Sequence, residues 1–265
     1  KALAKSMDLR FGRIQFTPDL LPSDLTGINF YNMKTQEFEF RPGPLFAQVI
    51  LADEINRATP KTQSAMLEVM QEHQVTIANT AYDMPEIFMV VATQNPIEQE
   101  GTYLLAEAQL DRFLLKEKLT YPNQEEEFEI LNRIENDVFS TKSFVTDISD
   151  VKLLQSLTKR VYIDNAIKKY IIAIIDATRH PERFLPPDLA QYVTMGASTR
   201  GAIALMEVSK AMALMRGRHY VIPDDVRALI HSVLRHRITL NYAAVADGIS
   251  EERIIDAIVG AIQTP

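Results

Sequence analysis

Two continuous apolar runs place the strongest constraint on how this chain can fold. Residues 47–52 read AQVILA and residues 87–92 read IFMVVA. Such runs are typical of strands that are buried on both faces of a parallel sheet. Between them, residues 58–73 carry a helical pattern with Thr59 as N-cap and Pro60 in the first turn. Strands that alternate with helices predict an α/β fold with a parallel sheet and right-handed crossovers.

The remaining strand signals also fall in the first half of the chain. They predict strands at residues 13–17 and 113–122, and hairpins at residues 28–40 and 74–86. After Pro122 the patterns are those of amphipathic helices, without strand signals. The sequence therefore predicts an α/β domain over residues 1–123 and an all-helical domain over residues 124–265.

Within the helical half, several helices are marked by their own residues. Residues 166–177 place four isoleucines on one helical face. Ser198 or Thr199 is expected to cap one helix and Ser250 another, and Pro223 is expected to begin a helix that runs to Arg237.

Composition narrows the class of protein. The chain has 265 residues, of which 46% are hydrophobic and 24% charged, the balance of a soluble globular protein. A net charge of -7 argues against a general nucleic-acid surface, and the absence of cysteine excludes disulfide and thiolate chemistry. No apolar run reaches the ~18 residues of a membrane span, and no signal-peptide pattern is present. We therefore expect a cytoplasmic protein that does not act on nucleic acid.

Polar side chains follow both apolar runs at the point where each predicted strand ends. Asp53 and Glu54 follow the first run, and Thr93 to Asn95 follow the second. Ligands of open parallel sheets bind at the carboxyl ends of the strands. An Asp there can hold Mg²⁺ through water, a following Glu can polarise an attacking water, and Asn95 can bind that water or a phosphate. The alternative is that apolar strands simply end in surface acids, and the residues alone leave both explanations open.

Two arginines in the later sequence are weaker candidates. Residues 196–200 read GASTR, so Arg200 is expected in the first turn of a capped helix, where anions bind. Arg112 lies in the segment QLDRF, before a predicted strand. Taken alone, each is better explained structurally: Arg200 as an exposed arginine on a capped helix, and Arg112 as a salt-bridge partner of Asp111 or a nearby acid. The histidines are scattered, and none of them indicates a metal site.

In combination, these segments resemble the MoxR family of AAA+ ATPases. Residues 49–57 (VILADEINR) resemble the Walker B motif, residues 92–96 (ATQNP) the sensor-1 strand, and residues 196–200 the start of the sensor-2 helix. The phrases RIQFTPDLLPSDLTG, ILADEINRATPKTQSAMLEVMQE, ATQNPIEQEGTY and EAQLDRF resemble MoxR proteins in particular. The resemblance extends from about Ala2 to Arg237.

The resemblance implies an AAA+ P-loop NTPase-type parallel sheet followed by a helical lid domain. The hairpin at residues 28–40 resembles the helix-2 insert, and residues 75–85 resemble the insert before sensor 1. It further implies ATP and Mg²⁺ as cofactors and a homo-oligomeric ring, commonly a hexamer, with the nucleotide between subunits. The implied activity is that of an ATP-hydrolysing chaperone whose partners are von Willebrand A domain proteins or client complexes.

The resemblance also assigns roles at the strand ends and beyond. Asp53 would hold Mg²⁺ through water, Glu54 would be the catalytic base, and Asn95 would be sensor 1. Arg112 would be the arginine finger that reaches the nucleotide of a neighbouring subunit.

Two further arginines would bind the nucleotide. Arg200 would be the sensor-2 residue, and Arg57 would act across the same subunit interface as the arginine finger.

The sequence departs from the family pattern in two places. Residues 103–106 (YLLA) stand where the family usually has prolines. The phosphate-binding motif G-x-x-x-x-G-K-[ST] is absent, since none of the nine glycines is followed by lysine. In the family this motif lies immediately upstream of the segment that resembles KALAKSM. We therefore expect Lys1 to fall within the helix that follows the P-loop of a longer protein.

Two other functions remain open at this stage. One is a non-hydrolysing interaction scaffold that has the fold without the P-loop. The other is a related AAA+ motor that acts on DNA, which the acidic composition argues against. A Gly-Lys-Thr or Gly-Lys-Ser encoded upstream of Lys1 would favour the ATPase over the scaffold.

Overall fold

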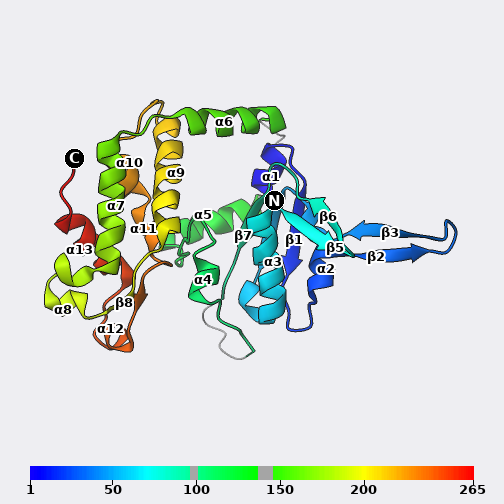
Figure 1. Cartoon of the computed structure of the whole chain (residues 1–265), viewed down its shortest axis with the longest axis horizontal. Helices are drawn as coiled ribbons and strands as arrows, with labels where there is room; N and C mark the ends of the chain where they lie inside the picture. The colour runs from blue at the N-terminus through cyan, green and yellow to red at the C-terminus, as the bar shows by residue number, and fades with distance from the viewer. Residues whose placement is uncertain (96–100, 137–145) are drawn as a thin grey trace. The chain divides into compact units, whose positions relative to one another are not determined.

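The computed structural model describes residues 1–95, 101–136 and 146–265 (Figure 1). The chain forms two compact units: the first comprises residues 1–106 and 120–152, and the second comprises residues 107–119 and 153–265. The units therefore interleave along the sequence. The single domain boundary after residue 123 remains a prediction.

The first unit is built around a parallel sheet. Its elements are α1 (Ala2–Ser6), β1 (Phe11–Gln15), α2 (Pro22–Thr26), β2 (Gly27–Asn32), β3 (Glu37–Pro42), η1 (Pro44–Phe46), β4 (Val49–Asp53), η2 (Ile55–Arg57), α3 (Pro60–Glu72), β5 (Gln74–Ile77), β6 (Thr80–Asp83), β7 (Met89–Ala92) and α5 (Gln124–Glu135). Among the described residues the strand order is β1-β4-β7, and both pairings are parallel. The predicted parallel sheet is confirmed, and its first strand begins two residues earlier than expected.

The middle strand explains why the sequence pattern is so apolar. β4 is paired on both edges, and Val49, Ile50 and Ala52 are buried. Helix α3 begins at Pro60 as predicted and buries apolar side chains such as Met66. Because most of β4 is buried, polar residues appear only where the strand ends.

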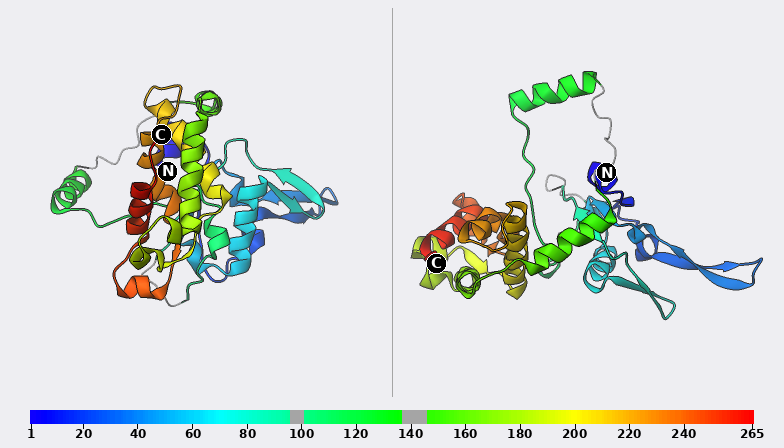
Figure 2. Two further views of the ribbon diagram at one scale, coloured as in Figure 1. Left: turned by 60° about the vertical axis from the view of Figure 1, so that its left-hand side comes forward. Right: turned by 90° about the horizontal axis from the view of Figure 1, so that it is seen from above.

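Both predicted hairpins are present. β2 pairs with β3 and β5 pairs with β6, each antiparallel. The β2–β3 hairpin projects well beyond the sheet of its own unit (Figure 2). The rings of Phe40 and Tyr82 stack with centroids 4.0 Å apart, so the two hairpins contact each other.

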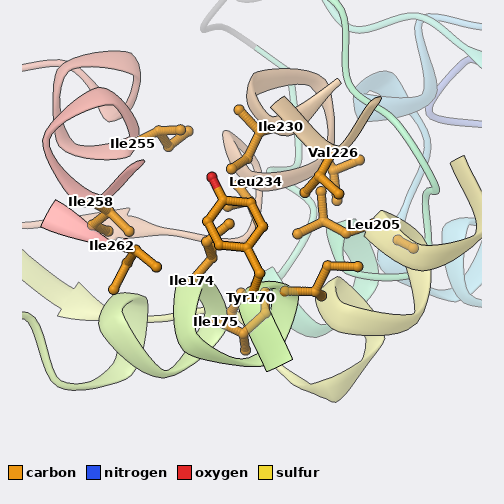
Figure 3. Close-up of a cluster of buried hydrophobic side chains, with 14 of the residues drawn as sticks. Tyr170, Ile174, Ile175, Leu205, Val226, Ile230, Leu234, Ile255, Ile258 and Ile262 are labelled. Atoms are coloured by element: carbon orange, nitrogen blue, oxygen red, sulfur yellow. The ribbon is translucent and has the colours of Figure 1, made fainter. Parts of the chain in front are cut away.

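The second unit is mainly helical. Its elements are α4 (Glu107–Leu110), α7 (Asn165–Arg179), η3 (Pro181–Arg183), α8 (Pro187–Ala190), β8 (Val193–Met195), α9 (Thr199–Met215), α10 (Pro223–Ala228), α11 (Ile230–Leu234), β9 (Thr239–Leu240), α12 (Tyr242–Ala246) and α13 (Glu251–Ala261), and α6 (Ile148–Arg160) spans the division between the units. Isoleucines of α7 meet side chains of α9, α11 and α13 in one buried cluster (Figure 3). Ser250 caps α13 as predicted, and of the two candidates at the start of α9 it is Ser198 that caps the helix.

Two sequence predictions about this part of the chain are wrong. Residues 113–122 form no strand. A strand needs a partner for its ladder, and here the amide of Lys116 donates to Ser232, while side chains bond the neighbouring carbonyls. The all-helical prediction also misses the pairing of β8 with β9. These strands have three and two residues, too few to show an alternating pattern.

No helix among the described residues is long and apolar enough to cross a membrane.

Candidate functional site

The parallel pairing of β4 with β7 brings the polar strand ends together. Ala52 pairs with Ala92, so Asp53 and Thr93 come next on adjacent strands. The ladder continues one step beyond the strands, because the amide of Thr93 donates to Ala52 and the amide of Ile55 donates to Thr93. We call Asp53, Glu54, Thr93 and Asn95 the strand-end site.

The carboxylate of Asp53 is held from two sides. The Thr93 hydroxyl donates to Oδ1 at 2.6 Å, and Arg13 donates to Oδ2 through Nη2 at 2.7 Å and Nε at 3.2 Å. The Thr93 hydrogen bond and then the Arg13 hydrogen bond lower the pKa of Asp53 below its usual value, against a smaller opposing effect of burial. Asp53 is therefore an anion at neutral pH.

Glu54 leaves the strand in an unusual backbone conformation. Its φ of 56° and ψ of 49° lie in the left-handed region, which non-glycine residues adopt rarely and at a cost. Its amide donates to the Thr93 hydroxyl at 2.9 Å. Its Oε2 accepts from Gln15 Nε2 at 2.9 Å and from Arg57 Nη1 at 3.2 Å. The turn thus directs the carboxylate of Glu54 toward the side chains of Gln15 and Arg57. These side chains lie next to the groups that bind Asp53.

Asn95 is positioned by the buried amide of Asn56. Nδ2 of Asn56 donates to the Asn95 carbonyl at 3.2 Å, and Oδ1 of Asn56 accepts from the Asn95 amide at 3.4 Å. Both bonds go to the backbone of Asn95 and fix its position beside Asn56. Pro96, the last residue of the ATQNP segment, lies outside the described residues.

In the second unit, the start of α9 is fixed by close packing. A Cβ on Gly196 would lie 2.2 Å from the carbonyl oxygen of Thr178, so only glycine fits there. The Thr178 hydroxyl accepts from the Ala197 amide, and Ser198 Oγ accepts from the Arg200 amide at 3.0 Å. Arg200 therefore lies in the first turn of α9, as predicted.

Asp111 lies beside two arginines of the second unit, Arg200 and Arg237. Its Oδ1 accepts from Arg237 Nε at 2.9 Å, and its Oδ2 accepts from Ser198 Oγ at 2.7 Å. Nη1 of Arg200 lies 3.7 Å from the same Oδ2. Arg112, the next residue, is exposed in a turn. Asp111 is thus engaged by Arg200 and Arg237.

The structure therefore places the six predicted residues in two groups. Asp53, Glu54, Arg57 and Asn95 belong to the first unit, where an ion pair joins Arg57 to Glu54. Arg112 and Arg200 belong to the second unit and are both next to Asp111, one in sequence and one in space.

Comparisons with known proteins identify the family. Residues 1–115 match the ATPase family associated with various cellular activities (AAA), and residues 188–258 match the AAA lid domain. The chain is 47% identical to YeaC of Bacillus subtilis, with 100% of this chain and 80% of that protein covered. It is 44% identical to the chaperone MoxR1 of Mycobacterium tuberculosis, with 96% of this chain and 67% of that protein covered. The chain belongs to the MoxR family of AAA+ ATPases.

Solved structures agree with this assignment. A crystal structure of a candidate ATPase from Cytophaga hutchinsonii superposes with a TM-score of 0.92 at 47% sequence identity. The match covers 100% of this chain and 80% of that one. The AAA+ fold with a helical lid, predicted from the resemblance to MoxR proteins, is confirmed.

Sequence reasoning missed several residues that organise these sites in the MoxR-family chain. Arg13 and Gln15 alternate along β1 and reach the two acids of β4, a signal visible only once the strands are known to be neighbours. Arg237 lies at the end of a predicted helix and is buried. Its role could not be read from the sequence, because most arginines are exposed.

Proposed function

We propose that this chain hydrolyses ATP at the strand-end site and uses the energy to remodel partner proteins. The observation that carries the proposal is the meeting of Asp53, Glu54 and Thr93 at one edge of a parallel sheet in a MoxR-family chain. Phosphoryl transfer depends mainly on positioning and on electrostatic stabilisation, which such a set of fixed polar groups provides.

The side chains present suit Mg²⁺ as the resident ion. Oδ1 of Asp53 accepts one hydrogen bond, from Thr93, and a carboxylate oxygen can accept two. No group of three or more His, Cys, Asp or Glu that could hold a metal occurs among the described residues. A single ionised carboxylate suits Mg²⁺, which keeps several waters and takes further ligands from substrate phosphates. Bound Mg²⁺ would neutralise charge on those phosphate oxygens, and Asp53 would hold it through water.

Glu54 is the proposed catalytic base. Gln15 and Arg57 fix its Oε2, which orients the carboxylate for contact with an attacking water. Asn95, whose backbone is fixed by Asn56, would bind that water or the terminal phosphate as sensor 1.

Three arginines complete the proposed machinery. Arg112 is exposed and would serve as the arginine finger for the nucleotide of a neighbouring subunit in a ring, which we propose to be a hexamer. Arg200, in the first turn of α9, would bind phosphate as sensor 2, and Arg57 would act at the same subunit interface. We further propose a cytoplasmic protein whose partners contain von Willebrand A domains or are client complexes.

The decisive experiment replaces the proposed base. We expect the protein, expressed with any coding sequence that precedes Lys1, to hydrolyse ATP in the presence of Mg²⁺. Glu54→Gln should abolish turnover and leave ATP binding within about twofold, because the amide keeps the shape of the side chain but cannot take a proton. Phosphate release measures turnover, and equilibrium dialysis measures ATP binding.

The matched control is Glu68→Gln, the same change on an exposed position of α3. This variant should hydrolyse ATP at the unaltered rate. Unchanged turnover in Glu54→Gln would refute the role of Glu54, and absence of any ATP hydrolysis in the unaltered protein would refute the proposed function.

A further inference from the structure

The segment at residues 111–117 carries the proposed arginine finger but has no helix or strand of its own. The amides of residues 111–113 donate to carbonyls of α4, whereas the carbonyls of residues 111, 113, 114 and 116 accept from side chains elsewhere in the second unit. Three consecutive residues supply these side-chain donors. We call Arg235, His236 and Arg237 the Arg-His-Arg triplet.

Arg237 makes the largest contribution. Its side chain is 2% exposed, and Nε donates to Oδ1 of Asp111. Nη2 donates to the carbonyls of Asp111 at 3.1 Å and Phe113 at 2.7 Å. Nη1 donates to the carbonyl of Leu114 at 3.2 Å and to that of Val233 in α11. One guanidinium thus engages both sides of Arg112, from Asp111 to Phe113.

The other two members of the triplet extend this hold. Nε2 of His236 lies 3.0 Å from the Phe113 carbonyl, and Nη1 of Arg235 donates to the Lys116 carbonyl at 3.0 Å. The amide of Lys116 donates in turn to the Ser232 carbonyl at 2.8 Å. The backbone on both sides of Arg112 is therefore bound at several points, whereas Arg112 itself is exposed.

Asp111 links this arrangement to the start of α9. Its carboxylate accepts from buried Arg237 on one oxygen, and its other oxygen faces Ser198 and Arg200. Asp111 thus connects the turn that carries Arg112 to the start of α9, which carries the proposed sensor-2 residue Arg200.

We propose that Arg237, supported by His236 and Arg235, is a positioning residue for Arg112 and sets the direction in which Arg112 meets a neighbour's nucleotide. This inference rests on the proposed function, in which Arg112 is the arginine finger. A misplacement of about 1 Å in a catalytic group can reduce turnover about 100-fold, so the hold on the flanking backbone has catalytic consequences.

The first test is Arg237→Lys in the full protein. Lysine keeps the positive charge beside Asp111 but cannot donate to several carbonyls in fixed directions at once. We expect kcat to fall about 100-fold while the Kd for ATP and ring assembly remain unchanged. The matched control is Arg218→Lys, which alters an arginine that pairs with fully buried Asp225 and makes no hydrogen bond or ion pair with residues 111–117 of the described chain.

The control separates positioning from general loss of stability. If Arg218→Lys reduces kcat as much as Arg237→Lys, the effect is loss of stability of the unit and the proposal is overturned. In the double variant Arg112→Ala/Arg237→Lys, kcat should be no lower than in Arg112→Ala alone. A further large fall would overturn the proposal, because Arg237 would then act by a route other than Arg112.

Mixed rings distinguish this inference from the function on which it rests. Arg112→Ala subunits mixed with Glu54→Gln subunits should regain turnover, since each supplies what the other lacks. Arg237→Lys subunits mixed with Glu54→Gln subunits should regain turnover in the same way. If only the first mixture recovers, the positioning role is wrong and the finger role stands. If the first mixture does not recover, the finger role of Arg112 is wrong and the inference falls with it.

Discussion

The strand-end site and the 111–117 segment position charged side chains by opposite means. At the strand-end site, the backbone pairing of β4 with β7 is enough to place Asp53 beside Thr93, without help from side chains. The 111–117 segment has no ladder, and buried donors of the Arg-His-Arg triplet hold it in place. A site built on strand register should tolerate the loss of a single side chain, whereas a segment held by buried charge should not.

The largest expected effect comes from removing the buried guanidinium. Arg237→Met should lower the free energy of unfolding by about 3 kcal/mol or more, because Asp111 and three carbonyls of the segment lose a desolvated partner. Urea unfolding of the variant and the unaltered protein measures the difference. A loss below 1 kcal/mol would show that water replaces the guanidinium at little cost. It would contradict the stated difference between the strand-end site and the 111–117 segment.

The pH dependence of stability should come mainly from the same triplet. Burial, and then the charge of Arg237, lower the pKa of His236 from 6.5 to about 4. Its Nδ1 has no hydrogen-bond partner among the described residues, so protonation would bury an unsatisfied donor. The unfolded chain takes up this proton near pH 6.5 and the folded chain only near pH 4, so stability should fall as the pH drops through that window, by roughly 3 kcal/mol in total.

Asp53 should behave differently. Its pKa is lowered, so its contribution to stability is complete above the ordinary carboxyl range and is lost only below it.

The variant His236→Gln tests the contribution of His236, because it keeps an amide donor for the Phe113 carbonyl and removes the titration. Urea midpoints measured from pH 7 to pH 4.5 should therefore depend less on pH in this variant. An identical pH dependence in both proteins would contradict the assignment.

A smaller effect is expected at the strand-end site itself. Thr93→Val removes the donor to Asp53 and the acceptor of the Glu54 amide, and should cost about 1 kcal/mol of unfolding free energy. The carboxyl of Asp53 should then titrate at higher pH, as followed by NMR. Thr93→Ser restores the hydroxyl and should restore both properties. If serine fails to do so, packing of the threonine methyl group is the dominant contribution.

The smallest effect should follow from the exposed ion pair. Arg13 is 60% exposed, so Arg13→Met should change the unfolding free energy by no more than about 0.5 kcal/mol. Set against Arg237→Met, this change sharpens the comparison, since each variant replaces an arginine that pairs with an aspartate. Equal losses in the two urea titrations would mean that burial does not account for the difference between the regions.

The same contrast explains what could be predicted from the sequence. The strand ends were predictable because an apolar run followed by Asp53 and Glu54 depends only on local order along the chain. The caps at Ser198 and Ser250 were predictable for the same reason. Family resemblance then supplied roles for these residues, which remain proposals.

The failures share a different physical origin. Residues 113–122 have the apolar content of a strand, but a strand also requires a free ladder edge, and that depends on tertiary structure. The burial of His236 and Arg237 was unpredictable because it follows from the carbonyls that meet them, which lie more than 100 residues earlier in the chain. Such contacts leave no periodic pattern.

The interleaving of the two units has a practical consequence for fragments of this protein. A recombinant lid that begins at residue 124 would retain Arg237 but lack the Asp111, Phe113 and Leu114 groups to which it donates. Such a fragment would contain a buried cation without its acceptors and should be insoluble or partly unfolded. A linker that joins residue 119 to residue 153 would instead keep the whole second unit in one chain.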